Sequence, residues 1–263
     1  MLKVKILYSI IIPHFNTPKL LDICLNNLLK QKYDLNSFEI IVVDDGSNKI
    51  PNQIIKKYKS KFRNFLFYRC PKNKGPGNAR NIGIKNSNGQ YLFFLDCDDS
   101  LDVNALQYLK RIIIKKKYEI IFFNYKLKNK INKKFMRNDV NLFNVHKIQF
   151  VNLFISMNYN NSVIFSIYKK NFLIKNKIKF KNGFHEDILF FFKVFFISKS
   201  NFFFNKNLYI KHDRKNSIIN TFSKNHIHDY LNSWLEVKKI LINYYGKNYF
   251  NKIFLKNYIK GIF

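Results

Sequence analysis

The first half of the chain alternates short apolar runs with segments of helical periodicity. The runs are apolar or aromatic at nearly every position and cover residues 4–12, 38–43, 65–69, 91–95 and 119–125. The helical segments between them cover residues 18–30, 51–59, 77–85 and 103–115. A strand without polar alternation must be covered on both faces, as in parallel sheets that carry helices on each side. The alternation therefore predicts βαβ units and an α/β fold with a mainly parallel, Rossmann-like central sheet flanked by helices.

Beyond about residue 126 this rhythm weakens. A polar connector rich in Lys and Asn is followed by helical patterns at 146–157 and 186–198 and by strand-like patterns at 163–168 and 201–212, the last read as two short runs. From about residue 223 the pattern is helical, with aromatic side chains among lysines. We expect one domain over residues 1–220, followed by a basic, aromatic helical C-terminal region at 221–263.

The chain has 47 Lys and Arg against 16 Asp and Glu, which gives a net charge of +31. Such an excess suits an anionic partner: a nucleic acid, a membrane surface or a phosphorylated substrate. It also fits a compositional bias, because Lys, Asn, Ile, Phe and Tyr have AT-rich codons and are all abundant here. Both interpretations stay open. Because the lysines form no block or helical stripe, we expect no specific nucleic-acid partner.

The three cysteines, Cys24, Cys70 and Cys97, show no paired spacing. An odd, unpaired set argues against a disulfide framework or a zinc site and suits a reducing cytoplasm. The first apolar run is short for a signal sequence and ends at Pro13, so we interpret it as a buried strand. The apolar segment 189–197 is too short to span a bilayer and is broken by Lys193.

Polar clusters follow four of the expected strands. They are Pro13 to Asn16, Asp44 to Ser47, Lys72 to Gly75, and Asp96 to Asp99. In open α/β sheets, ligands bind in the crevice beyond the carboxyl ends of the strands, where these clusters would meet. Asp-Gly and Asp-Ser pairs are also common in turns and caps, so a structural role for Asp44 stays open, and Asp102 is expected to cap the helix from 103.

The side chains of Asp96, Asp98 and Asp99 crowd like charges against a buried strand, which is costly without a cation or donor beside them. Carboxylates without nearby His or Cys ligands suit Mg²⁺ or Mn²⁺, often shared with a phosphorylated ligand. Upstream, Lys74 and Arg80 flank a Gly-Pro-Gly turn and could meet a phosphate or a neighbouring carboxylate. The sequence therefore predicts a divalent-cation site after the fourth strand.

Three segments, SIIIPHFNT, IIVVDDGS and NKGPGNARNIGIKNSNGQYLFFLDCDDSLD, resemble in this order the signature segments of glycosyltransferase family 2. A fourth segment, GFHEDILFFFKV, resembles the Glu-Asp segment that opens a helix on the acceptor side of these enzymes. The family consists of inverting enzymes with the GT-A fold. The resemblance implies a bacterial enzyme of surface-polysaccharide synthesis, with a donor half at 1–105 and an acceptor half at 106–220.

The resemblance implies that the turn after the first strand lines the donor nucleotide. Pro13, Phe15 and Asn16 belong to this turn, and Phe15 takes the place of the family's usual Tyr beside the base. The replacement keeps a stacking surface but removes a hydroxyl. Asp44 matches the carboxylate that accepts a hydrogen bond from the uracil ring.

The resemblance further implies that Arg80 and Asp96 line the nucleoside and diphosphate, and Lys74 is expected at the same donor site. Asp98 matches the carboxylate before the metal ligand. The resemblance does not assign the roles of Asp98 and Asp99 individually. One would hold Mn²⁺ or Mg²⁺ directly, and the other would hold ribose or metal-bound water.

Asp187 matches the family's catalytic base, which removes the proton of the acceptor hydroxyl. From the residues alone, Glu186 and Asp187 could equally form the N-terminal cap of an apolar helix. His185 and Glu186 could orient the base or the acceptor. His212 and Arg214 lie in a segment that could close over the diphosphate, or they form a polar surface hairpin.

The leading expectation is an inverting transfer of a sugar from a UDP-sugar to a hydroxyl of a saccharide or lipid-linked acceptor, with Mn²⁺ or Mg²⁺ on the diphosphate. The expected location is the bacterial cytoplasm. The C-terminal helices could contact the anionic inner face of the membrane, or pack as a cap with solvated lysines. The alternatives are a nucleotidyltransferase of similar fold and a basic nucleic-acid-binding protein.

Overall fold

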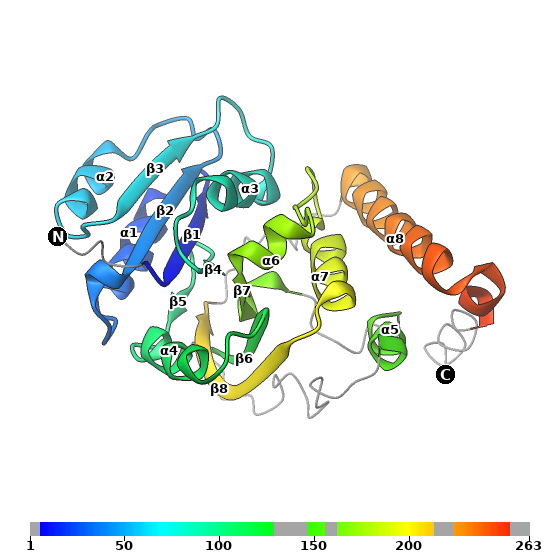
Figure 1. Cartoon of the computed structure of the whole chain (residues 1–263). Coiled ribbons are helices and arrows are strands. Elements are labelled where there is room, and N and C mark those ends of the chain that lie inside the picture. The colour runs from blue at the N-terminus through cyan, green and yellow to red at the C-terminus, as the bar shows by residue number, and fades with distance from the viewer. Residues whose placement is uncertain (1–5, 129–146, 156–161, 213–222, 253–263) are drawn as a thin grey trace.

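The computed structural model describes residues 6–128, 147–155, 162–212 and 223–252. Within these residues one sheet of eight strands runs through the molecule in the order β3-β2-β1-β4-β7-β6-β8-β5 (Figure 1). The strands are β1 Tyr8–His14, β2 Phe38–Asp44, β3 Phe65–Arg69, β4 Tyr91–Phe94, β5 Ser100–Leu101, β6 Ile120–Leu127, β7 Ser166–Lys169 and β8 Asn201–Lys211. The helices are α1 Pro18–Leu29, α2 Asn52–Lys59, α3 Pro76–Asn86, α4 Ala105–Lys115, α5 Lys147–Ile155, α6 Lys170–Lys175, α7 Glu186–Ile197 and α8 Lys224–Tyr245.

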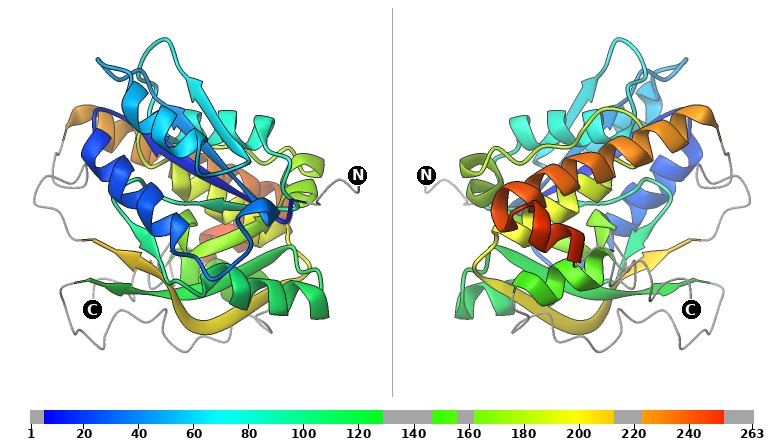
Figure 2. Two further views of the ribbon diagram at one scale, coloured as in Figure 1. Left: turned by 90° about the vertical axis from the view of Figure 1, so that its left-hand side faces the viewer. Right: turned by 90° about the vertical axis from the view of Figure 1, so that its right-hand side faces the viewer.

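The four strands β3, β2, β1 and β4 are parallel neighbours, as the sequence predicts. Every residue of β1, β2 and β4 is buried, because α1 and α2 cover one face of this half-sheet and α3 packs against β1 and β2 on the other (Figure 2). Parallel strands bring their carboxyl ends to one edge of the sheet. The polar clusters after these strands therefore gather at that edge.

The second half of the sheet is mixed. β7 runs antiparallel to both β4 and β6, whereas β8 is parallel to β6 and antiparallel to β5. The expected pair of short runs at 201–212 is one long strand, β8, whose register against β6 shifts on either side of Asn124. The expected cap of α4 is also different: Asn104 is the N-cap, and Asp102 accepts a hydrogen bond from the Asn104 amide in a local turn.

An aromatic core joins the sheet to the C-terminal helices. α7 is buried almost all round, and its Phe190 stacks on Phe180 with ring centroids 3.9 Å apart. α8 packs on α7 (Figure 2) and buries Val237 and Leu241. No helix among the described residues is long and apolar enough to cross a membrane. All three cysteines are buried free thiols.

Candidate active site

The ends of β1, β2 and β3 meet at Asp44. His14 Nδ1 lies 3.0 Å from Asp44 Oδ1, and Arg69 Nε lies 3.4 Å from Asp44 Oδ2. The Ser47 hydroxyl also donates to Asp44 Oδ1. Asp44 has no solvent-exposed surface. It therefore fixes these three neighbours, and a ligand could reach its carboxylate only if they moved apart.

The turn after β1 is tied to the turn after β2. The Asn16 amide donates to Ser47 Oγ at 2.8 Å, and Asn16 Oδ1 accepts from the Asn48 amide at 2.9 Å. Asn16 has φ of 51°, a left-handed conformation that Asn tolerates better than most residues. Pro13 is buried, whereas 41% of Phe15 is exposed. The two turns therefore hold an aromatic ring open to solvent at the carboxyl ends of β1 and β2.

Asp45 is a residue of this site that the sequence did not single out. Its carboxylate accepts hydrogen bonds from the Lys74 amide at 3.1 Å and the Gly75 amide at 2.7 Å. Burial raises its pKa, and these two amides oppose the rise. Asp45 thereby fixes the turn before α3, on which the exposed Lys74 is carried. Asp45 went unrecognised because an Asp-Gly pair is so common in turns.

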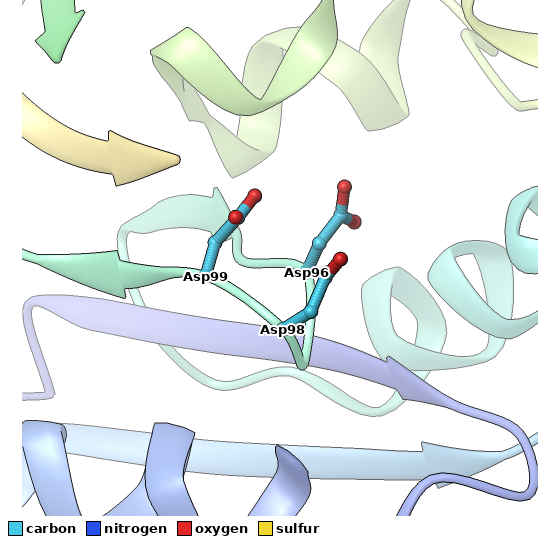
Figure 3. Close-up of side chains that lie close together, drawn as sticks. All are labelled: Asp96, Asp98 and Asp99. Carbon is cyan, nitrogen blue, oxygen red and sulfur yellow. The ribbon is translucent and has the colours of Figure 1, made fainter. Parts of the chain in front are cut away.

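Three carboxylates gather after β4. One oxygen each from Asp96, Asp98 and Asp99 lie within 4.8 Å of one another, and the side chains point into the same space (Figure 3). An all-oxygen donor set of this size suits a hard divalent cation such as Mg²⁺ or Mn²⁺. The cluster therefore offers a donor set that fits the cation that the sequence predicts.

Asp99 is the buried member of the cluster. Its Oδ2 accepts from the Tyr209 hydroxyl at 2.8 Å, and its Oδ1 accepts from the His212 amide at 2.8 Å. Burial, followed by the charges of Asp96 and Asp98, raises the pKa of Asp99 to about 7. β8 therefore holds the cluster in place. No sequence signal distinguishes Tyr209 from the other aromatic residues of this strand.

His212 follows the end of β8 and lies beside the cluster, where its amide donates to Asp99. Its Nε2 is 3.0 Å from the Ser100 hydroxyl. The pKa of His212 is lowered by burial and by the charge of Lys128. Arg214, predicted to act with it, lies outside the described residues.

Arg80 connects the aspartate cluster to the start of α7. Its Nη2 donates to Asp96 at 2.8 Å and its Nη1 to Glu186 at 2.5 Å, while its cation lies over the Phe180 ring. Burial alone would lower the pKa of Arg80, but the two carboxylates reverse this and raise it. Of the two partners that the sequence allowed for Arg80, phosphate and carboxylate, the structure contains carboxylates.

Asp187 lies next to Glu186 in the first turn of α7. The N-cap is His185, in a left-handed conformation with φ of 55°, so Asp187 is not the N-cap residue. Burial first, and then the charge of Glu186, raise the pKa of Asp187 to about 7, with Arg80 opposing them. A carboxyl group with such a pKa can take up a proton near neutral pH.

The Gly-Pro-Gly turn permits close packing between α3 and the segment before α7. A Cβ on Gly77 would lie 2.7 Å from both Glu186 Cγ and the Lys181 carbonyl oxygen. A Cβ on Gly75 would lie 3.3 Å from the Gly183 carbonyl oxygen. These glycines therefore allow Glu186 to approach Arg80.

Replacing Gly77 by Ala is expected to destabilise the protein by about 1–3 kcal/mol, because the added methyl group overpacks the contact with Glu186. A loss of stability is the opposite of the usual effect of Gly→Ala in a helix, where Ala is favoured over Gly by about 0.5–1 kcal/mol. Urea unfolding would measure the change, with Lys85→Ala on the exposed face of α3 as control. A Gly77→Ala variant as stable as the wild type would contradict the packing role.

Comparison with known proteins places this site in a family. The family model "Glycosyl transferase family 2" matches residues 9–212. The poly(ribitol-phosphate) β-N-acetylglucosaminyltransferase TarP of Staphylococcus aureus is 34% identical over 66% of this chain and 52% of its own length. The corresponding enzyme TarS is 34% identical over 38% of this chain and 18% of its own length. The chain thus spans about half or less of the length of these two relatives.

A third relative and a solved structure extend the comparison. The cholesterol galactosyltransferase of Borreliella burgdorferi is 28% identical over 83% of this chain and 63% of its own. Residues 1–349 of S. aureus TarS, crystallised with UDP-GlcNAc, superpose with a TM-score of 0.80 at 23% identity, covering 97% of this chain and 73% of that one. The family match runs from the second residue of β1 to His212, the residue after β8. The chain belongs to glycosyltransferase family 2 and has the GT-A fold.

Proposed function

We propose that this protein transfers a sugar from a UDP-sugar to an acceptor hydroxyl with inversion at the anomeric carbon, and that Asp187 is the general base. One observation carries the proposal. Arg80 bridges Asp96 of the aspartate cluster and Glu186. The residue after Glu186 is Asp187, so its carboxyl group, which has a pKa of about 7, lies beside the candidate cation site. Such a pKa suits proton removal at neutral pH.

In this proposal the donor nucleotide occupies the edge formed by β1, β2 and α3. The exposed ring of Phe15 stacks on the base, and Pro13 and Asn16 shape the turn that carries it. Asp44 contributes to binding of the nucleotide base by holding His14 and Arg69 in place. If these two side chains move apart, its carboxylate can accept a hydrogen bond from the base directly. Lys74 provides positive charge from the turn before α3. The similar TarS structure was crystallised with UDP-GlcNAc, which supports a UDP-sugar as donor.

The leaving group lies at the aspartate cluster. Asp98 and Asp99 would hold the divalent cation, which would supply positive charge for the departing diphosphate. Asp96 stays paired with Arg80 and lines the diphosphate. His212 lies at the cluster edge, and we propose that it contacts the diphosphate.

Asp187 removes the proton of the acceptor hydroxyl while that oxygen attacks the anomeric carbon. The carbon–oxygen bond to the diphosphate breaks on the opposite face, so the configuration inverts. Glu186 is held by Arg80 at 2.5 Å, and its charge adds to burial in keeping the pKa of Asp187 high. His185 orients the base or acceptor from the loop before α7.

The acceptor we propose is a saccharide or lipid-linked polymer of the bacterial surface. TarS and TarP are both named as poly(ribitol-phosphate) N-acetylglucosaminyltransferases, so hexose or N-acetylhexosamine transfer is the favoured reaction. The net charge of +31 suits a phosphate-bearing acceptor of this kind. The proposed location is the cytoplasm.

UDP-sugars together with Mn²⁺ are expected to raise the melting temperature, because binding to the native state alone stabilises it. Thermal-shift measurements with UDP-glucose, UDP-galactose and their N-acetyl forms, each with Mn²⁺ or EDTA, would detect this. No stabilisation by any nucleotide would contradict the donor site. Release of pyrophosphate from a nucleoside triphosphate would favour a nucleotidyltransferase instead.

We also propose that α8 contacts an anionic membrane surface. Ile227, Leu231 and Leu235 are 48%, 54% and 51% exposed and recur every four residues, so they share one face. The exposed Lys224 and Lys238 fall on the same side of the helix. Apolar side chains with flanking lysines are typical of helices that lie in the headgroup region of a bilayer.

The double variant Leu231→Ser with Leu235→Ser is expected to bind anionic vesicles about tenfold more weakly, because each Leu loses part of the roughly 1.5–3 kcal/mol of full burial. Vesicle co-sedimentation would measure the affinity. Ile114→Ser is the matched control, since Ile114 of α4 is 71% exposed and has no such stripe around it. Equal binding by both variants would contradict the membrane contact.

A further inference from the structure

The loop at 181–185, which leads into Glu186 and Asp187, rests against α8. The Phe184 amide donates a hydrogen bond to Asp229 Oδ2 at 2.9 Å. Gly183 has φ of 98°, and a Cβ at this position would collide with the carboxylate of Asp229. Only glycine both adopts this conformation readily and leaves room for the Asp229 side chain.

Aromatic rings extend this contact. The Phe184 ring stacks on His226 of α8, with centroids 3.6 Å apart and an interplanar angle of 30°. The His185 ring meets Tyr230 edge to face at 5.3 Å, and the Ser233 hydroxyl donates to the His185 carbonyl oxygen at 3.4 Å. The loop is therefore attached to α8 through both its backbone and its side chains.

The opposite side of the loop rests on α3. Gly75 and Gly77 allow the close approach of the Gly183 and Lys181 carbonyl groups, and Arg80 holds Glu186. His185 has φ of 55°, a left-handed conformation that a residue other than glycine rarely adopts in an isolated chain. Contacts from both sides are needed to keep such a loop in one shape.

We propose that Asp229 is a positioning residue for the transfer reaction: from α8 it fixes the loop at 183–185 and thereby aims Asp187 at the acceptor hydroxyl. The inference rests on the proposed role of Asp187 as base. It makes α8 part of the acceptor side of the active site. Small displacements of a catalytic group can cost about a hundredfold in rate, so a loosened loop has a measurable effect.

The test compares Asp229→Ala and Asp229→Asn with Glu236→Ala. Glu236 is the other acidic residue of α8, and it pairs only at the surface, with Lys239 at 3.1 Å. Asp229→Ala is expected to lower kcat for transfer by about tenfold or more, with the Kd for the UDP-sugar unchanged. Asp229→Asn keeps an oxygen that accepts from Phe184 and is expected to restore most of kcat. Glu236→Ala is expected to match the wild type.

Hydrogen exchange of residues 181–186 tests the attachment without any assay of transfer. These amides are expected to exchange faster in Asp229→Ala than in Glu236→Ala or the wild type. Unchanged exchange would overturn the attachment, and faster exchange with a wild-type kcat would overturn the positioning role. If Asp229→Ala does not fold, an Asp229→Asn variant that folds but lacks transfer would also overturn it. Failure of the proposed function is distinct, since it would appear as wild-type transfer by Asp187→Asn.

Discussion

Asp187→Asn is expected to remove sugar transfer while leaving donor binding intact. The amide has the shape of the carboxylate but cannot accept the proton of the acceptor hydroxyl, and a lost general base costs about 10²–10⁴-fold in rate. The aspartate cluster and the Phe15 turn are untouched, so the Kd for the UDP-sugar with Mn²⁺ is expected to stay at the wild-type value. Initial rates of UDP release and titration calorimetry would measure the two quantities.

The pH dependence of the wild type gives a second check on the same residue. Asp187 acts only when deprotonated, and burial and Glu186 raise its pKa to about 7. The rate is therefore expected to rise with pH between roughly pH 6 and pH 8. Glu186→Gln removes the neighbouring negative charge, lowers the pKa of Asp187 and is expected to move the midpoint to lower pH.

Asp22→Asn is a suitable control for Asp187→Asn. Asp22 is a surface carboxylate of α1 that pairs with Lys57 at 2.7 Å and contacts none of the site residues described above. The Asp22→Asn variant is expected to transfer sugar at the wild-type rate, with an unshifted pH profile. Wild-type transfer by Asp187→Asn would remove Asp187 as base and leave the donor site unaffected.

The donor half of the fold could be predicted from sequence because its information is local. Each of β1 to β4 is a nearly continuous apolar run, and each helix between them shows apolar residues at helical spacing. The mixed half could not be predicted in the same way. β7 inserts antiparallel between β4 and β6, a pairing between residues about 75 positions apart in the chain at Leu92 and Tyr168, and an apolar strand does not encode the direction of its neighbour.

The site could be predicted where charge is crowded in the sequence. Asp96, Asp98 and Asp99 lie within four positions of one another, and the structure brings their oxygens together. The residues that hold the site come from distant segments. Tyr209 on β8 donates to Asp99, and Asp229 on α8 accepts from the Phe184 amide before α7; both look like ordinary strand and helix residues in the sequence. Only tertiary structure shows which surface carboxylate or buried hydroxyl faces the site.

Asp98→Ala and Asp99→Ala are each expected to abolish Mn²⁺-dependent binding of the UDP-sugar. A cation of this class is held by few protein carboxylates, so losing one removes a large part of its binding energy. Asp99→Ala also leaves the Tyr209 hydroxyl and the His212 amide without their acceptor. Titration calorimetry of the UDP-sugar with Mn²⁺ and with EDTA would measure the loss, expected to be about a hundredfold or more in affinity.

Two further variants separate cation binding from general damage to this loop. Tyr209→Phe keeps the Asp99 carboxylate but removes the hydroxyl that orients it, so we expect a smaller loss of affinity, about tenfold. Asp102→Ala removes a nearby carboxylate that only closes a local turn and is expected to bind as the wild type does. If Asp98→Ala and Asp99→Ala bind the donor equally well in Mn²⁺ and in EDTA, at wild-type affinity, the cluster is not the cation site. If only one of them loses binding, that residue is the direct ligand, and its neighbour lines the ribose.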